Sequence, residues 1–273
     1  MGEIVRHHGL VPVPLDLDLS SMAPRAELLS AALSPASRVL VVAHIFGARL
    51  DMAPWVAAAA AAGLLLVEDC AEVFEGVEHY SGHAAADLTL FSFGSIKTCS
   101  ALGGAVGWVR DGAMRERMRA LQAAYPVRPR AAVAWRLLSY AGLCALQAPL
   151  CLGLAVRTLE LAGLQFETFI TGAVRGFAGS ELIAGIRHRP PLGILRLLAR
   201  KLGRFDRASQ VGERQRLARL LCDELGPDVE VSEALSPLFC WPLWLTLLSR
   251  FPAGRARSTP SGCFQWWWAT RVR

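Results

Sequence analysis

Two apolar segments that each end in a chemically active group constrain the fold of this chain most. Residues 64–69 are apolar until a carboxylate pair ends them, and residues 88–93 lead through a Gly and Ser turn to Lys97. Both segments are typical of buried strands. The alanine-rich residues 52–63 precede the first segment and end at Gly63, as a helix does. Strand, helix and strand in succession predict an α/β fold with a mostly parallel sheet.

Lys97 is the residue that this pattern singles out. A lysine between two apolar strands either extends into water or lies in a polar pocket, where its amine loses a proton easily and suits Schiff-base chemistry. Asp69 would reach the same crevice, because functional groups gather at the carboxyl ends of parallel strands, although an aspartate there is also a common helix N-cap. Ser92 lies five residues before the lysine. These three groups are the ones that a pyridoxal phosphate (PLP) site needs for its aldehyde, pyridine nitrogen and phosphate.

Four ordered motifs resemble those of the DegT/StrS-type sugar aminotransferases. They are Val42–Gly47, Asp51–Met52, Val67–Glu72 and Phe91–Lys97, and the resemblance spans roughly residues 9–118. Four motifs in the right order and spacing are far more specific than any one alone. The resemblance implies a PLP-dependent enzyme of fold type I.

The resemblance also implies a role for each site residue. Lys97 is the internal aldimine lysine, which also moves a proton between cofactor and substrate. Asp69 is the partner of the pyridine nitrogen, and Ser92 is a phosphate ligand. Glu72 takes the place where the family usually carries glutamine or histidine beside the cofactor ring. His44 lies near the cofactor in the family, with a strand-end histidine satisfied by backbone as the alternative. No metal ligands are expected.

The activity implied by the resemblance is amino transfer to a nucleotide-linked keto-sugar or a similar carbonyl substrate. Family members use glutamate or glutamine as amino donor, serve polysaccharide biosynthesis and work as cytoplasmic homodimers. The chain departs from the pattern at Ala101–Gly104, where the usual Gly-Glu-Gly-Gly is missing a carboxylate. It also begins after the turn that grips the phosphate in relatives. The alternative is a catalytically weak or inactive relative that serves as a binding or membrane-associated scaffold.

The chain is expected to have three parts. Its 273 residues and apolar content of 53% allow a large domain and a smaller one. Pro126 and Pro129 mark a boundary after the motifs. We expect a partial PLP-binding large domain at 1–125, a helical apolar and basic insertion at 126–205, and an incomplete small domain with an irregular tail at 206–273. The resemblance therefore indicates a family member truncated at both ends.

The segment Leu137–Val156 contains twenty residues without a charge. That length meets the criterion for a membrane span, but a proline, a glutamine and two glycines interrupt it. A buried helical hairpin, a helix in the plane of a membrane and a true span are the three alternatives. The resemblance favours the hairpin or the surface-lying helix, so peripheral membrane contact through 137–156 stays open.

The net charge of +6 comes partly from arginines between residues 187 and 207. Such a patch could bind nucleic acid, anionic lipid or a nucleotide diphosphate. We favour a solvated helix face and no nucleic-acid partner, because no aromatic interleaving or nucleic-acid motif accompanies the charge. The seven cysteines form no C-x-x-C pair, and the first residues lack the apolar core of a secretory signal. A reducing compartment, the cytoplasm, is therefore expected.

Overall fold

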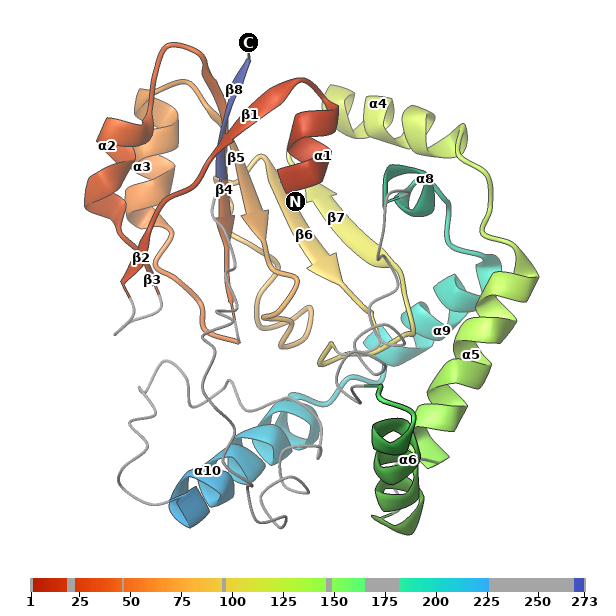
Figure 1. Cartoon of the computed structure of the whole chain (residues 1–273). Helices are drawn as coiled ribbons and strands as arrows, with labels where there is room; N and C mark the ends of the chain where they lie inside the picture. The colour runs from red at the N-terminus through yellow and green to blue at the C-terminus, as the bar shows by residue number, and fades with distance from the viewer. Residues whose placement is uncertain are drawn as a thin grey trace.

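The computed structural model describes residues 2–18, 23–45, 47–94, 97–145, 149–164, 182–225 and 268–272. Within these ranges the chain has an α/β fold, in which helices lie beside one six-stranded sheet (Figure 1). In spatial order the strands are β1 (Leu10–Val13), β8 (Trp268–Val272), β4 (Ser37–Ala43), β5 (Leu65–Asp69), β6 (Leu88–Ser92) and β7 (Ala105–Val109). Strands β1, β4, β5 and β6 run in one direction, and β7 and β8 run in the other. The predicted α/β class with a mostly parallel sheet is confirmed.

The other described elements are helical or very short. A two-stranded ribbon pairs β2 (Leu17–Asp18) with β3 (Ala23–Pro24). The helices are α1 (Gly2–His7), α2 (Leu29–Ala32), α3 (Ala53–Ala61), α4 (Gly112–Ala123), α5 (Arg130–Ala145), α6 (Pro149–Leu161), α8 (Leu182–Ile186), α9 (Leu192–Leu202) and α10 (Glu213–Leu225). The 3-10 turn η1 (Ala26–Leu28) precedes α2, and the π-helical turn η2 (Ala208–Gly212) precedes α10.

The two faces of the sheet differ in how deeply their side chains are buried. In the strand register Glu68 lies between Val42 and Thr89, and all three are buried. Asp69 leaves the opposite face, because successive residues of a strand alternate. On that side Val67 and Asp69 are only half-buried. We call the side of Glu68 the enclosed face and the side of Asp69 the open face.

Helices cover the enclosed face at both of its ends. Leu40 and Leu66 pack in one core cluster with Trp55 of α3. Phe93 packs in a second cluster with Leu198 of α9. Each large apolar side chain buried in this way stabilises the fold by about 1.5–3 kcal/mol. The packing fixes the strands whose ends carry the predicted site.

Helix α3 shows how the local sequence sets these elements. Its alanines have the highest intrinsic helix propensity, and Pro54 occupies the first turn, where a missing N–H does no harm. It buries Trp55 and Ala59 against the sheet. Gly63 follows with φ of +61°, a left-handed conformation that glycine adopts at little cost. The chain then enters β5 directly.

Five residues of the carboxyl-terminal tail form a strand that the sequence did not predict. Residues 206–273 were expected to end in an irregular tail, but residues 268–272 form β8 between β1 and β4, antiparallel to both. That expectation is wrong for these five residues. The physical reason is that β1 and β4 would each otherwise leave a row of unpaired backbone groups at that edge. The predicted small-domain strand at 237–242 lies outside the described residues, and the division into three parts stays a prediction.

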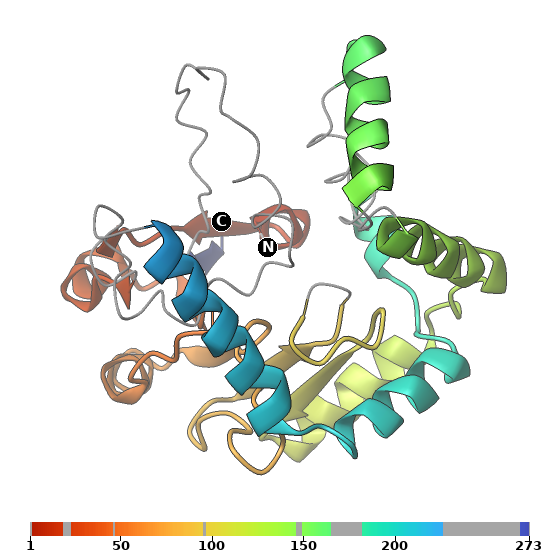
Figure 2. The same ribbon diagram turned by 90° about the horizontal axis from the view of Figure 1, so that it is seen from below.

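The uncharged segment Leu137–Val156 is divided between α5 and α6. Figure 2 shows that these two green helices do not lie side by side. Their large apolar side chains are mostly exposed, as at Leu138 (65%) and Leu150 (89%). The described parts of the segment therefore do not form a buried hairpin. No helix within the described ranges is both long enough and apolar enough to cross a membrane.

The basic residues of α9 lie on its solvent side. Leu198 is the buried residue of this helix, whereas Arg196, Arg200 and Lys201 are exposed. Just beyond the helix, Arg207 donates from Nε to Glu75 at 3.2 Å. This part of the arginine-rich segment is a solvated helix face, as the sequence predicted.

Candidate functional site

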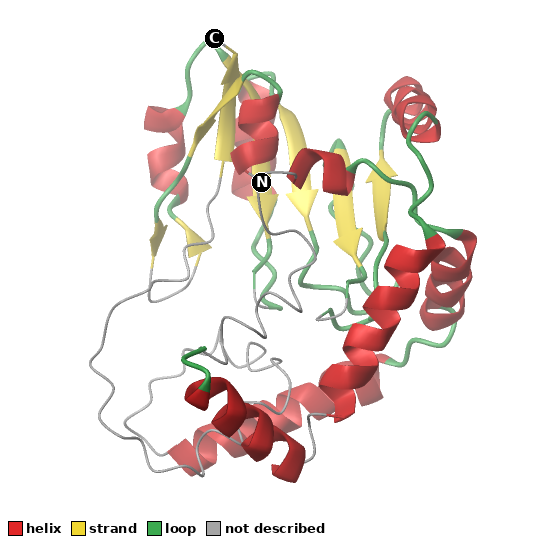
Figure 3. Cartoon of the chain, turned by 45° about the vertical axis from the view of Figure 1, so that its right-hand side comes forward, coloured by secondary structure: helices red, strands yellow, loops and turns green. Residues whose placement is uncertain are grey.

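The loops that follow β5 and β6 gather at the carboxyl ends of these strands, where the arrowheads point in Figure 3. Asp69 is the last residue of β5, and Ser92 is the last residue of β6. The register places Asp69 beside Leu90, and Ser92 lies two residues further along. Asp69 and Ser92 therefore both project from the open face. The structure brings these two predicted site residues to one edge of the sheet.

Lys97 lies in the loop between β6 and β7, and this loop is closed at its base by buried Phe93. The Phe93 carbonyl accepts the N–H groups of Ala101 and Gly103, both at 3.0 Å, and the Phe93 N–H donates to the Gly104 carbonyl at 3.0 Å. Lys97 itself donates its backbone N–H to the carbonyl of Gly94 at 3.2 Å. In the described part of this loop, hydrogen bonds thus hold the backbone at Phe93 and at Lys97.

The departure from the family pattern carries backbone strain. Leu102, at the place where the resemblance led us to expect a glutamate, has φ of +62°, in the left-handed region. A residue with a Cβ pays about 1–2 kcal/mol for that conformation. The two glycines that follow also have positive φ, which they tolerate. The strained turn returns the chain from the lysine loop to β7.

The side chain of Lys97 forms an ion pair instead of extending into water. Its Nζ donates to Oε1 of Glu72 at 3.4 Å. The side chain of Lys97 is 18% exposed and that of Glu72 is 28% exposed. The structure thus places two more of the predicted site residues together, one from each loop.

Asp69 lies close enough to Lys97 and Glu72 to interact electrostatically with both. Burial raises the pKa of the Asp69 carboxyl, a hydrogen bond from the Ala71 N–H and the positive charge of Lys97 lower it, and the negative charge of Glu72 raises it. The bond from Ala71 to Oδ1 is 3.0 Å long and closes a turn, and no helix begins there. Asp69 is therefore not the helix N-cap of the alternative interpretation. The amine of Lys97 and the carboxyl groups of Asp69 and Glu72 therefore interact with one another at this edge of the sheet.

The side chain of His44, the remaining predicted site residue, is hydrogen-bonded to Glu68 on the enclosed face of the sheet. His44 follows β4 by one residue, two residues beyond Val42, on the side of the enclosed face. The backbone N–H of Leu50 donates to Nδ1 at 3.1 Å, so the other nitrogen, Nε2, carries the proton and donates to Glu68 Oε1 at 2.8 Å. Both ring nitrogens are occupied, one of them by backbone. A place for His44 beside a cofactor stays a prediction.

Glu68 is the central residue that the sequence analysis missed. Besides His44, it accepts hydrogen bonds from the Tyr80 hydroxyl, from the His83 N–H at 2.7 Å and from Thr89 Oγ1 at 3.4 Å. Burial by itself raises the pKa of Glu68, but the bonds from His44, Tyr80 and His83 outweigh it and lower the pKa to about 2. The available signal was a glutamate at an inward position of an apolar strand, which is almost never buried without partners.

His44, Glu68 and Cys70 have the composition of a metal site. Their ligand atoms lie within 4.8 Å of one another, and all three residues are buried. A metal would need an unprotonated nitrogen and a thiolate. The His44 nitrogen that faces Glu68 carries its proton, and burial, followed by the nearby negative charge of Glu68, raises the pKa of the Cys70 thiol. The three residues form a hydrogen-bonded core cluster, and we assign no metal to them.

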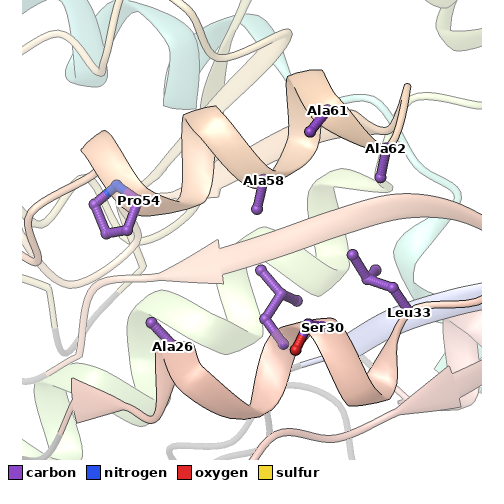
Figure 4. Close-up of a pocket in the computed structure, with 8 residues that line it drawn as sticks. Ala26, Ser30, Leu33, Pro54, Ala58, Ala61 and Ala62 are labelled. Carbon is purple, nitrogen blue, oxygen red and sulfur yellow. The ribbon is translucent and has the colours of Figure 1, made fainter.

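A groove of about 360 Å³ lies between η1, α2 and α3. Figure 4 shows its lining, which comes from residues 26–33 and 54–62 and consists of alanine, leucine and proline side chains with one serine, Ser30. It contains no charged group and none of the predicted site residues. The groove offers no chemistry for an anionic cofactor or substrate.

The fold and the position of Lys97 place the amino-terminal half of the chain among α/β domains with their chemistry at the carboxyl edge of parallel strands. The comparison with known families identifies a particular family within this class. Residues 2–136 match the DegT/DnrJ/EryC1/StrS aminotransferase family, and the match assigns this part of the chain to that family. The family predicted from the four motifs is thereby confirmed.

Two characterised relatives share the same part of the chain. The L-glutamine:2-deoxy-scyllo-inosose aminotransferase of Streptoalloteichus tenebrarius is 30% identical over 115 residues, which are 41% of this chain and 27% of that protein. The UDP-N-acetyl-3-dehydro-alpha-D-glucosamine 3-aminotransferase of Acidithiobacillus ferrooxidans is 29% identical over 123 residues, 44% of this chain and 33% of that protein. The matched part is thus a third or less of each relative.

Solved structures also align with part of the chain. A crystal structure of DesI with its TDP-sugar product is 26% identical, with a TM-score of 0.41, and the alignment covers 45% of this chain and 31% of that one. The aminotransferase TlmJ from Streptoalloteichus hindustanus is 25% identical, with a TM-score of 0.37, over 42% of this chain and 31% of that one. In both comparisons the shared part is less than half of this chain.

Proposed function

We propose that this chain forms part or all of a PLP-dependent aminotransferase in which Lys97 attaches the cofactor. The observation that carries the proposal is the largely enclosed amine of Lys97, which lies in the loop after the parallel strand β6 and interacts with the charge of Asp69. The sequence supports it further, because Lys97 and Lys201 are the only lysines among 29 lysine and arginine residues. Imine chemistry requires a lysine, because the guanidinium of arginine does not lose its proton, and Lys97 is one of only two lysines in the sequence.

The residues present fit the cofactor in part. Lys97 offers an amine for its aldehyde, Asp69 a carboxylate for its pyridine nitrogen, and Ser92 a hydroxyl for its phosphate. Asp69 and Ser92 project from the same face of the sheet, so both side chains would be available to hold one cofactor there. When bound, PLP supplies an aldehyde and a ring that accepts electrons.

Each residue then has a defined task. The Asp69 carboxylate holds a proton on the pyridine nitrogen, where positive charge is needed. The Ser92 hydroxyl donates to a phosphate oxygen, a charge-assisted bond of about 1.5–3 kcal/mol. The Lys97 amine would hold the cofactor and would also serve as the group that carries a proton to or from the substrate carbon.

A cyclic keto-sugar is the proposed amino acceptor. One relative acts on 2-deoxy-scyllo-inosose with L-glutamine, and another acts on a UDP-linked 3-dehydro sugar. Both names describe a ring ketone that bears hydroxyl groups. We propose glutamine or glutamate as the donor, a nucleotide-linked keto-sugar as the acceptor, and a cytoplasmic homodimer that serves polysaccharide biosynthesis, on the strength of the family match.

The two lysines make the test direct. The purified chain is incubated with PLP, reduced with borohydride, digested and mapped by mass spectrometry. We expect the reduced cofactor on Lys97, with exposed Lys201 as the internal comparison and Lys97→Ala as the variant that loses the label. Label on Lys201 alone, or equal label on both lysines, would refute the assignment. Amino transfer from L-glutamine to a UDP-linked keto-sugar then tests the substrate class.

A further inference from the structure

Helices α5 and α6 carry large apolar side chains that are exposed. Both helices lie on the β7 side of the sheet (Figure 1). Trp135 is 73% exposed and Leu161 is 84% exposed, and three further leucines of these helices are mostly exposed: Leu138, Leu150 and Leu154. Scattered exposed leucines are ordinary, whereas a group of them in one region marks a site of interaction. We call these five side chains, with the two helices that carry them, the α5–α6 surface.

The exposed leucines of α6 follow helical spacing. Leu150 and Leu154 are four residues apart, and Leu161 comes seven residues later, so all three lie along one side of the helix. Arg157 lies on the same side, three residues after Leu154, and is exposed as well. A helix that lies in the plane of a lipid surface has this arrangement, because leucines enter the acyl region while an arginine reaches the headgroups.

The charge of this region has one sign. Between Glu116 and Glu160 the sequence contains no Asp or Glu. The same interval contains six arginines: Arg117, Arg119, Arg128, Arg130, Arg136 and Arg157. The last three belong to α5 and α6, and none of these three forms an ion pair with a carboxylate of the described residues. The α5–α6 surface therefore combines exposed apolar side chains with positive charge that is not neutralised locally.

We propose that the α5–α6 surface binds the surface of a membrane that contains anionic phospholipid. The leucines enter the boundary between headgroups and acyl chains, and Trp135 lies at the level of the headgroups, where tryptophan is favoured. The arginines contact the negative groups of the lipid. The contact is peripheral, because α5 and α6 have only 16 and 13 residues. The inference is independent of the proposed function, since no residue of the candidate site lies in these helices.

A second copy of this chain is the other partner that such a surface could accept, and the charge argues against it. A two-fold interface would bring the arginines of two identical surfaces together. The two helices carry a single carboxylate, Glu160, to neutralise them. Like charges across an interface oppose association, whereas anionic lipid has the complementary charge. Lipid is therefore the partner that the observations favour.

Flotation with vesicles tests the proposal on the full chain. The protein is mixed with vesicles of phosphatidylcholine that contain about one third phosphatidylserine, and in parallel with vesicles of phosphatidylcholine alone. We expect the chain to float with the anionic vesicles, to bind the neutral vesicles at least roughly tenfold more weakly, and to lose most of its binding in high salt. Equal binding to both kinds of vesicle, or binding to neither, would overturn the proposal.

A matched pair of double variants locates the contact. Leu150→Gln with Leu154→Gln keeps good helix-forming residues and removes apolar area, so we expect binding to the anionic vesicles to weaken at least roughly tenfold. The control is Leu217→Gln with Leu220→Gln, at two exposed leucines of α10, which should leave binding unchanged. Far-ultraviolet circular dichroism checks that both proteins keep their helices. Unchanged binding in the α6 variant, or an equal loss in the α10 control, would overturn the proposal.

Two further measurements test the charge and the alternative partner. Arg157→Gln should weaken binding to the anionic vesicles roughly fivefold and reduce its dependence on salt. Sedimentation velocity without lipid should give the same mass for wild type and for the α6 variant. If the wild type forms a dimer that the α6 variant loses, and neither protein binds vesicles, the surface joins two copies of the chain and the proposal is overturned.

Discussion

The imidazole of His44 donates its Nε2–H to Oε1 of Glu68 over 2.8 Å, and both side chains are wholly enclosed. The bond joins the end of β4 to β5. Through Tyr80 and His83, the same carboxylate ties the segment after β5 to the sheet. Asp69 is the next residue along β5. The hydrogen bonds of Glu68 on the enclosed face therefore help to fix the backbone position of Asp69, whose carboxylate projects from the open face.

We predict that Glu68→Gln destabilises the fold by about 1–3 kcal/mol at neutral pH, because the amide nitrogen faces donors that need an acceptor. Glu78→Gln, at an exposed glutamate of the same segment, is the control. Urea unfolding followed by tryptophan fluorescence measures both variants. A change within error for Glu68→Gln would show that the cluster adds little to stability.

The same residue predicts a pH dependence. The pKa of Glu68 lies at about 2 in the folded chain, below its ordinary value of 4.5. A depressed carboxyl pKa contributes stability that is fully present above the ordinary value and is lost as the pH falls towards the folded value. Wild-type stability should therefore approach that of Glu68→Gln between pH 4.5 and about 2. Parallel pH profiles for the two proteins would contradict this assignment.

Asp69→Asn should have the opposite effect on the cofactor-free chain. Burial raises the pKa of Asp69 in the folded chain above its value in the unfolded chain. The neutral carboxyl therefore stabilises the fold at low pH, and this stabilisation is lost as the pH rises through the pKa of the folded chain. Asparagine keeps the acceptor for the Ala71 N–H but carries no charge. We expect a higher Tm than wild type at pH 7, a difference that disappears in acid, and weaker binding of PLP. A lower Tm at pH 7 would show that the ionised carboxylate is held favourably.

The site residues that the sequence could predict are those with local signals. Asp69 and Ser92 lie at the ends of apolar runs, and Lys97 follows the turn after the second run, so strand periodicity places all three at a common edge. The ordered motifs added Glu72, and its contact with Lys97 follows because the loops after two neighbouring strands meet. The assignment of these residues to a cofactor stays a prediction.

The parts that the sequence could not predict depend on contacts between distant segments. The partners of Glu68 come from β4, from the segment after β5 and from β6, and no single stretch reveals them. Strand β8 pairs with β1 across more than 250 residues. Whether the apolar side chains of α5 and α6 are covered depends on tertiary packing, which their uncharged sequence does not encode.

We predict that the segment Leu137–Val156 does not cross a membrane. Helix α5 has 16 residues and α6 has 13. At 1.5 Å per residue both are shorter than the hydrocarbon core of about 30 Å. After fractionation of expressing cells, any protein found with membranes should be released by carbonate. Retention in the pellet would indicate a true span and would contradict the division of the segment between two helices of these lengths.

Two glycines in left-handed conformations offer a matched test of whether the segment after β5 packs directly against the sheet. Gly82 has φ of +101°, and a Cβ there would overlap Oγ1 of Thr89, a partner of Glu68. Gly63 has φ of +61°, with nothing within 4 Å of a Cβ. Gly63→Ala should cost about 1 kcal/mol from backbone strain alone. Gly82→Ala should cost this strain and about 1–3 kcal/mol more, because Thr89 is fixed in the sheet and must move away from Glu68. Urea unfolding of both variants gives the difference, and equal losses would show that the segment stands clear of Thr89 in solution.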